Sequence, residues 1–232
     1  MNHTSGIQLW FLRLVSAILL AGQVFLHLLN GKIHRRNTID QMIIVGPESL
    51  TISLVTAGFV GMVFTIQVAR EFINFGAGTT VGGVLAVALT RELAPVLTAV
   101  VVAGRVGSAF AAEIGTMRVT EQIDALYMLK TDPIDYLVIP RVLACCLMLP
   151  ILNLLFLIVG MAGGILVADN LYGIPTSVFL KSTRDFLDLW DLSSAMIKSV
   201  VFGGLIAIVG CSWGLRSEEH TSELQSPCNL VC

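Results

Sequence analysis

The feature that most constrains this chain is a run of 21 residues without a charge, Ser49 to Ala69, which lies between Glu48 and Arg70. A helix needs ~20 apolar residues, at ~1.5 Å each, to cross the ~30 Å hydrocarbon core of a bilayer. The run therefore predicts a transmembrane helix. Composition agrees, because 55% of the residues are hydrophobic and only 13% are charged, whereas a soluble domain carries about 25% charged residues.

Three further stretches predict spans of the same kind. They are residues 81–104, interrupted by Arg91 and Glu92, residues 142–168, which contain Pro150 and Asn153, and residues 195–215, which contain Lys198. We therefore expect an all-α integral membrane protein, a polytopic helical bundle whose four transmembrane helices form a permease domain over residues 49–216.

Other classes of protein are disfavoured by charge and cysteine usage. The net charge of −2 offers no basic footprint for nucleic acid. The five cysteines lack the spacing of a zinc site or of a disulfide framework, so we expect no metal centre.

Residues 1–48 are predicted to hold an N-terminal interfacial helix and a basic linker. The segment from Ile7 to Leu29 is mostly apolar but is interrupted by Arg13, which favours a helix lying in the membrane interface. A full span and a cleaved signal peptide are the alternatives, although Met1 to Gly6 contains no Lys or Arg of the kind that begins a secretory signal.

Basic residues gather in two segments, which predicts the orientation of the chain. Lys32, Arg35 and Arg36 precede the first span, and Arg105, Arg118, Lys130 and Arg141 lie between the second and third. By the positive-inside rule both segments are expected on the cytoplasmic side. Residues 169–191 contain four aspartates against Lys181 and Arg184 and are expected on the opposite side.

The loop that begins at Arg105 contains a predicted helix from Thr116 to Leu129, which Asp132 and Pro133 should stop. Val119, Ile123, Leu126 and Lys130 recur at helical spacing on one face of it. A short amphipathic helix of this kind can dock into a groove of a partner protein or lie on lipid headgroups. The spacing alone leaves both interpretations open.

Residues 91–117 (RELAPVLTAVVVAGRVGSAFAAEIGTM), 120–126 (TEQIDAL) and 132–141 (DPIDYLVIPR) closely resemble the MlaE-type permeases. These are membrane subunits of the MCE-associated ABC transporters that move lipids between membranes. The sequence of these segments is most similar to the cyanobacterial and plastid branch. The resemblance runs from about Ile7 to Arg216, and it implies a multi-pass protein of a bacterial inner or plasma membrane or of the plastid inner envelope.

The resemblance implies a homodimer of permease subunits, bound by two cytoplasmic ABC ATPase subunits and, on the far side, by MCE-domain substrate-binding proteins. The helix from Thr116 to Leu129 would then be the coupling helix that receives the motion of the ATPase. The residues expected to act in this coupling are Glu113, Met117, Val119, Glu121, Ile123, Asp124 and Leu126.

No cofactor is expected on the chain itself. It contains no G-x-x-x-x-G-K-[ST] phosphate loop. Gly31-Lys32 would match the Gly-Lys pair of this motif, but Leu26 occupies the position of the first glycine. ATP and Mg²⁺ should therefore be bound by the partner ATPase, and the chain is expected to be a transport subunit rather than an enzyme.

Charged residues inside spans are costly and indicate function by default. Glu92 and Lys198, with Arg91 beside Glu92, are expected to line a central cavity that contacts or gates a lipid headgroup. The structural alternative is an internal salt bridge, or a Lys198 side chain that reaches up to the membrane interface. Two other functions stay open: an ion-coupled secondary transporter that uses Glu92, and a membrane scaffold without transport activity.

Small residues and helix breakers recur inside the spans. The glycines, among them Gly58, Gly61 and Gly160, predict close helix packing. Pro150 and Asn153 predict a kink or local unwinding of the third span, with a buried partner for the Asn153 amide.

After Arg216 the resemblance ends, and residues 217–232 are polar and too short to span a membrane. The family continues at this point with a fifth transmembrane helix. We therefore interpret residues 217–232 as a non-native tail on a permease that lacks its last helix.

Overall fold

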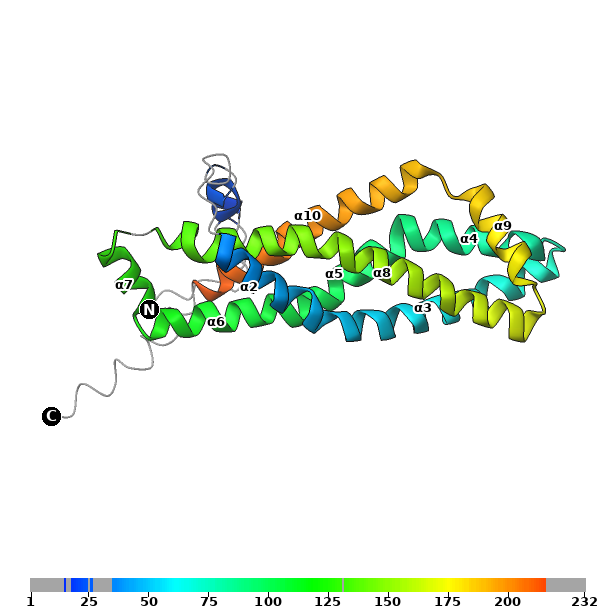
Figure 1. The fold of residues 1–232 in the computed structure, drawn as a ribbon, viewed down its shortest axis with the longest axis horizontal. Coiled ribbons are helices and arrows are strands. Elements are labelled where there is room, and N and C mark those ends of the chain that lie inside the picture. The colour runs from blue at the N-terminus through cyan, green and yellow to red at the C-terminus, as the bar shows by residue number, and fades with distance from the viewer. Residues whose placement is uncertain (1–14, 16–17, 25, 27–34, 131, 216–232) are drawn as a thin grey trace, which may run out of the picture. The chain divides into compact units, whose positions relative to one another are not determined.

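The computed structural model describes residues 15, 18–24, 26, 35–130 and 132–215. Within these residues the secondary structure is helical and contains no strand. Four helical stretches among them are long and apolar enough to cross a membrane, namely Arg35–Asn74, Gly78–Val119, Ile134–Tyr172 and Leu189–Gly214 (Figure 1). The prediction of an all-α polytopic membrane protein is confirmed. The predicted N-terminal interfacial helix lies mostly, and the 217–232 segment wholly, outside the described residues.

The first stretch consists of α2 (Arg35–Val45) and α3 (Pro47–Asn74). Gly46 separates them, and Pro47 occupies the first turn of α3, where a missing N–H costs nothing. The prediction of a linker before residue 49 is wrong from Arg35 onward, where helix α2 begins. No helix breaker occurs between Arg35 and Gly46, so the helix continues to Val45. The buried face of α3 repeats every fourth residue: Ser49, Ser53, Ala57, Gly61, Thr65 and Ala69.

The second stretch is one long helical path with two π-helical turns. It comprises η1 (Gly78–Thr80), α4 (Val81–Ala88), η2 (Leu89–Leu93), α5 (Ala94–Val102), η3 (Ala103–Gly107) and α6 (Ser108–Val119). The predicted end at Gly104 and the loop from Arg105 are wrong, since the helix continues to Val119. A charge at Arg105 ends an apolar run, but it does not end a helix when the residues after it are good helix formers such as those in Ala109–Glu113.

The third stretch joins η4 (Ile134–Val138) to α8 (Ile139–Tyr172). Pro150 lies inside α8 without interrupting it, so the predicted local unwinding is not found. The buried partner expected for the Asn153 amide is not found among the described residues, where neither its Nδ2 nor its Oδ1 has a hydrogen-bond partner.

Residues 169–191, expected as a loop, contain α9 (Thr176–Phe186), and α10 (Leu189–Gly214) follows. Helix α9 lies alongside α4 (Figure 1). Ser182 Oγ accepts the Gly83 N–H at 3.0 Å, and Thr183 Oγ donates to the Gly82 carbonyl at 3.2 Å. A Cβ on Gly82 would overlap the Phe179 carbonyl oxygen, so this glycine pair permits the close approach of the two helices.

The chain divides into two compact units, one made of Met1–Met42, Ala103–Cys145 and Gly204–Cys232, the other of Ile43–Val102 and Cys146–Gly203. In the second unit α3, α4, α5 and α8 surround a core that includes Ala57, Leu89, Ala94 and Phe156. Gly61 and Gly160 meet there backbone to backbone, which confirms that small residues serve helix packing at this position.

Candidate functional site

Arg91 and Glu92 lie in the π-helical turn η2, and the cause is visible in the sequence. In an α-helix the Arg91 carbonyl would accept the N–H of the residue four positions later, which is Pro95 and has none. Lys198 of α10 supplies the missing donor, with its Nζ 2.6 Å from the Arg91 carbonyl oxygen. The same ammonium is 3.1 Å from Glu92 Oε1. Lys198 thus joins a freed backbone carbonyl and a carboxylate of the second stretch.

A second ion pair lies beside the first. Arg91 Nε is 2.7 Å from Asp191 Oδ1, at the start of α10. The Asp191 side chain is only 4% exposed, whereas that of Arg91 is 56% exposed. The structure therefore brings all three predicted cavity residues together. It adds Asp191, which the sequence did not distinguish from the neighbouring aspartates Asp169, Asp185 and Asp188.

The four charged groups differ in how much they offer to a ligand. The Glu92 side chain is 73% exposed and that of Lys198 is 40% exposed within the single chain. Arg91 and Lys198 together present two cationic donors, a combination that suits phosphate or carboxylate oxygens. No group of three or more metal-ligating side chains occurs in the part of the chain that the structure describes.

The predicted coupling helix is not continuous. Helix α6 ends at Val119, Glu121 adopts a left-handed conformation with φ of 57°, and α7 (Gln122–Met128) begins in a new direction. The pairing of Arg118 Nη1 with Asp124 Oδ1 at 3.2 Å spans this turn. The single helix from Thr116 to Leu129 is therefore a wrong prediction, and Val119 does not share a helix with Ile123.

The apolar ridge expected on that helix is also differently placed. Ile123 is buried at 1% exposure and packs into the protein, and Leu126 is partly buried. The most exposed apolar residues of this region lie at the end of α7 and directly after it: Tyr127 at 60%, Met128 at 88% and Leu129 at 73%. We call these three residues the α7 tip. Helix α7 ends at Met128, one residue before the predicted end at Leu129. Asp132 and Pro133 lie beyond this end, where Asp132 Oδ1 accepts the Ile134 N–H at 3.0 Å at the start of η4.

Glu113, predicted to act in coupling, is already engaged inside the chain. Its Oε2 is 2.8 Å from Arg141 Nη2 on α8, and the Arg141 side chain is 3% exposed. Arg141 Nη1 also donates to the Leu137 carbonyl at 3.1 Å, and the guanidinium lies over the Phe110 ring, 5.4 Å from its centroid. The pair joins α6 to α8. Met117 and Glu113 line a small polar pocket of about 210 Å³ beside it, together with Asp40, Gln41 and Tyr136.

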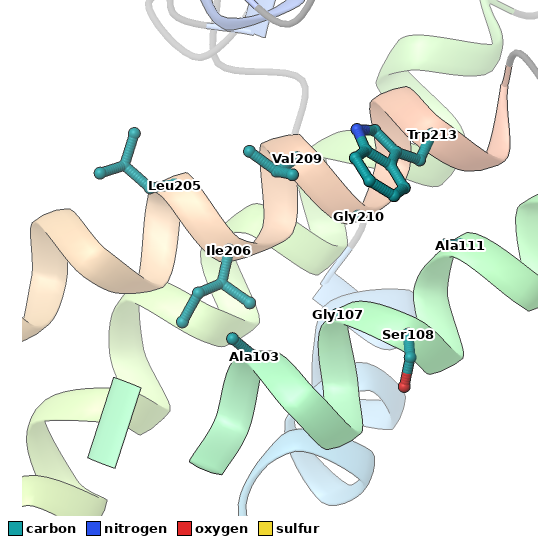
Figure 2. Close-up of a pocket in the computed structure, with 9 residues that line it drawn as sticks. All are labelled: Ala103, Gly107, Ser108, Ala111, Leu205, Ile206, Val209, Gly210 and Trp213. Atoms are coloured by element: carbon teal, nitrogen blue, oxygen red, sulfur yellow. The ribbon is translucent and has the colours of Figure 1, made fainter. Parts of the chain in front are cut away.

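An apolar groove of about 550 Å³ lies between η3 and α6 on one side and α10 on the other (Figure 2). Gly107 and Gly210 form its closest approach, since a Cβ on Gly210 would be 2.8 Å from the Gly107 carbonyl oxygen. Leu205, Val209 and Trp213 are half exposed along α10. The Ser108 hydroxyl donates to the Gly104 carbonyl at 2.7 Å, so the lining offers little free hydrogen-bonding capacity.

The four apolar stretches of membrane-spanning length in the described residues, two of them joined by the ion pairs Arg91–Asp191 and Lys198–Glu92, define the chain as a multi-pass membrane protein. Its sequence matches the family described as Permease MlaE over residues 38–228. The chain belongs to this family, and the resemblance of residues 91–117 is thereby confirmed.

Named relatives narrow the class. The chain is 70% identical over 212 residues to the probable ABC transporter permease protein slr1045 of Synechocystis sp., covering 91% of this chain and 81% of that protein. It is 50% identical over 208 residues to the probable ABC transporter permease protein ycf63 of Porphyra purpurea, covering 90% and 79%. The chain is thus a membrane-embedded permease of an ABC transporter family.

A third relative is the chloroplastic protein TRIGALACTOSYLDIACYLGLYCEROL 1 of Arabidopsis thaliana, 54% identical over 203 residues. The match covers 88% of this chain and 58% of that protein. The cyanobacterial and plastid branch expected from the sequence is confirmed by these relatives.

Proposed function

We propose that the chain is the membrane subunit of an ABC transporter that moves lipids between membranes, with ATP hydrolysed by a partner ATPase. The observation that carries the proposal is the charged cluster of Arg91, Glu92, Asp191 and Lys198 inside helices of membrane-spanning length, in a chain of the MlaE permease family. Charges at this depth are retained where they serve a substrate path or a gate.

A phospholipid is the substrate class that the chemistry suits best. Arg91 and Lys198 can pair with a headgroup phosphate. In the other unit, the groove along α10 has an apolar lining of the kind that suits an acyl chain. The Arabidopsis relative carries the name of a glycerolipid. In the proposed complex two copies of the chain form a homodimer around a central cavity, and an MCE-domain protein receives or delivers the lipid on the far side.

The proposed contact with the ATPase is the α7 tip and the turn before it. Exposed apolar side chains at the end of a short helix fit a groove on a partner, and α7 lies within the basic segment predicted to be cytoplasmic. Val119, Glu121 and Asp124 are exposed around the same turn and are available for the rim of this contact. ATP and Mg²⁺ belong to the partner chain in this proposal, as does the hydrolytic step.

The proposal is tested by reconstituting the permease with its ATPase and MCE-domain protein in vesicles and measuring transfer of a fluorescent phospholipid. Lys198→Met should reduce ATP-dependent transfer at least tenfold without loss of ATPase binding, because Glu92 and the Arg91 carbonyl lose their cationic partner. Lys181→Met, the same change at an exposed position of α9, is the matched control and should transfer lipid normally.

Three results would count against the proposal. Wild-type transfer that does not depend on ATP but collapses with Glu92→Gln would favour the ion-coupled transporter. Absence of any transfer in an intact complex would favour the scaffold. Equal transfer by the Lys198 and Lys181 variants would remove the charged cluster from the mechanism.

A further inference from the structure

Within the described residues, three polar side chains of the second unit are fully buried and have unpaired polar atoms. They are Ser53 on α3 at 0% exposure, Thr98 on α5 at 1% and Asn153 on α8 at 0%. The unpaired atoms are Ser53 Oγ, Thr98 Oγ1 and both amide atoms of Asn153. Buried polar groups are nearly always satisfied, and each exception calls for an explanation.

Contacts between the helices indicate the level of each residue. Gly160 of α8 meets α3 between Ala57 and Gly61, and it meets the second stretch at Leu89. Asn153 lies seven residues before Gly160, Ser53 lies four residues before Ala57, and Thr98 lies nine residues after Leu89. At about 1.5 Å per residue, their distances from the Gly160 level along the bundle are about 10 Å, about 6–12 Å and about 13 Å, in that order.

The three displacements point the same way along the bundle. Gly160 of α8 faces Ala57 and Leu89, whereas Gly164, one turn later, faces Thr65 and Leu85. Contacts thus advance along α3 as they advance along α8, and they move backward along α4, so α3 and α8 run parallel and the α4–α5 path runs opposite. Ser53, Thr98 and Asn153 therefore lie within roughly one helical turn of one level, and we call them the polar layer.

We propose that this polar layer is an internal binding site for water within the membrane-spanning bundle. The donors and acceptors decide the class of ligand. Asn153 Nδ2 has two N–H donors that would face a cation unfavourably, and none of the three side chains carries a charge to stabilise an anion away from water. Water both donates and accepts, and it binds where two to four polar partners converge.

Bound water explains how the fully buried amide of Asn153 is hydrogen-bonded. It also connects α3, α5 and α8 through polar contacts inside the membrane, where apolar surface provides no drive for helix association. The inference concerns the permease chain alone. It does not depend on the lipid substrate or on the ATPase.

A double-mutant cycle tests the layer on the purified full chain in detergent. Thr98→Val should lower the thermal unfolding midpoint by about 2–4 °C in the wild-type background, because it removes a partner of the bound water. In an Asn153→Leu background, where leucine displaces the water, the same change should leave the midpoint unchanged or raise it. Thr65→Val, which removes a buried hydroxyl bonded to the Gly61 carbonyl, is the control and should shift the midpoint equally in both backgrounds.

Equal effects of Thr98→Val in the two backgrounds would overturn the proposal, since independent sites are additive. Asn153→Met, which also fills the space of the water with an apolar side chain, serves as the second background if the leucine variant does not fold. An experimental structure that resolves ordered water gives the direct readout. We expect a water oxygen within about 2.7–3.2 Å of Asn153 Oδ1 or Nδ2. A direct hydrogen bond from that amide to another protein atom, or an amide without any neighbour, would refute the site.

Discussion

Gly61→Ala is the change whose effect the structure defines most sharply. A Cβ on Gly61 would overlap the Gly160 carbonyl oxygen and lie 2.7 Å from its carbonyl carbon. The obstacle is backbone of α8, which cannot move aside as a flexible side chain can. Overpacking of this kind costs about 3 kcal/mol, while replacing a helical glycine by alanine regains about 1 kcal/mol. The net loss is about 2 kcal/mol, which for a chain of this size lowers the unfolding midpoint by about 4–8 °C.

Gly58→Ala is the matched control, three residues earlier on the same helix. The nearest atom to a Cβ there is Val159 Cγ1 at 3.8 Å, an ordinary contact. The gain in helix propensity then dominates, and the midpoint should stay constant or rise by a few degrees. The assay is thermal unfolding of both variants in one detergent, followed by tryptophan fluorescence. If Gly61→Ala unfolded at or above the midpoint of Gly58→Ala, the reasoning from the α3–α8 contact would be refuted.

Three further changes follow from the site. Met128→Asp at the α7 tip should weaken co-purification of the partner ATPase at least tenfold and leave the unfolding midpoint unchanged, whereas Ile123→Asp should lower that midpoint. Equal ATPase binding by Met128→Asp and wild type would contradict the docking surface. Glu113→Gln should lower the unfolding midpoint, because it leaves the buried Arg141 guanidinium without its carboxylate. A Glu113→Gln/Arg141→Met double variant should recover part of this loss. If the midpoint did not recover, the broken ion pair would not be the cause of the destabilisation. Ala111→Phe should fill the groove beside Trp213 and reduce phospholipid transfer while ATPase binding persists. Transfer at the wild-type rate by this variant would refute a role of the groove in transfer.

The sequence was sufficient to predict four spans, because long apolar runs have few other uses. It could not predict their ends. Arg105 marks the end of the charge-free run, yet α6 continues to Val119 because its residues favour helix. The actual break, at Thr120 and Glu121, lacks the glycine or proline that usually signals one. Glu121 adopts φ of 57° although it is not a glycine, and non-glycine residues with positive φ are uncommon, so the local pattern did not predict a break there.

The residues of the candidate site were likewise predicted only in part from the sequence. Glu92 and Lys198 were found because charge inside an apolar run is conspicuous, and one of the two stated alternatives, the salt bridge, describes their geometry. Asp191 and Arg141 were missed because each lies among other charges in a segment expected to be a loop. Only the three-dimensional structure shows that their side chains are 4% and 3% exposed. Burial is what distinguishes them from their neighbours, and a single sequence does not contain it.

Pro95 links the backbone of the second stretch to its charges. It removes the N–H that the Arg91 carbonyl would accept from, and the helix responds with the π turn from Leu89 to Leu93. Successive side chains of an α-helix point about 100° apart, yet Arg91 and Glu92 both reach partners on α10. The freed carbonyl explains how, since Lys198 binds it and thereby lies within reach of Glu92. Replacing Pro95 by alanine should restore the Arg91 hydrogen bond within the helix and release Lys198 from that carbonyl. The cluster therefore depends on a residue that carries no charge.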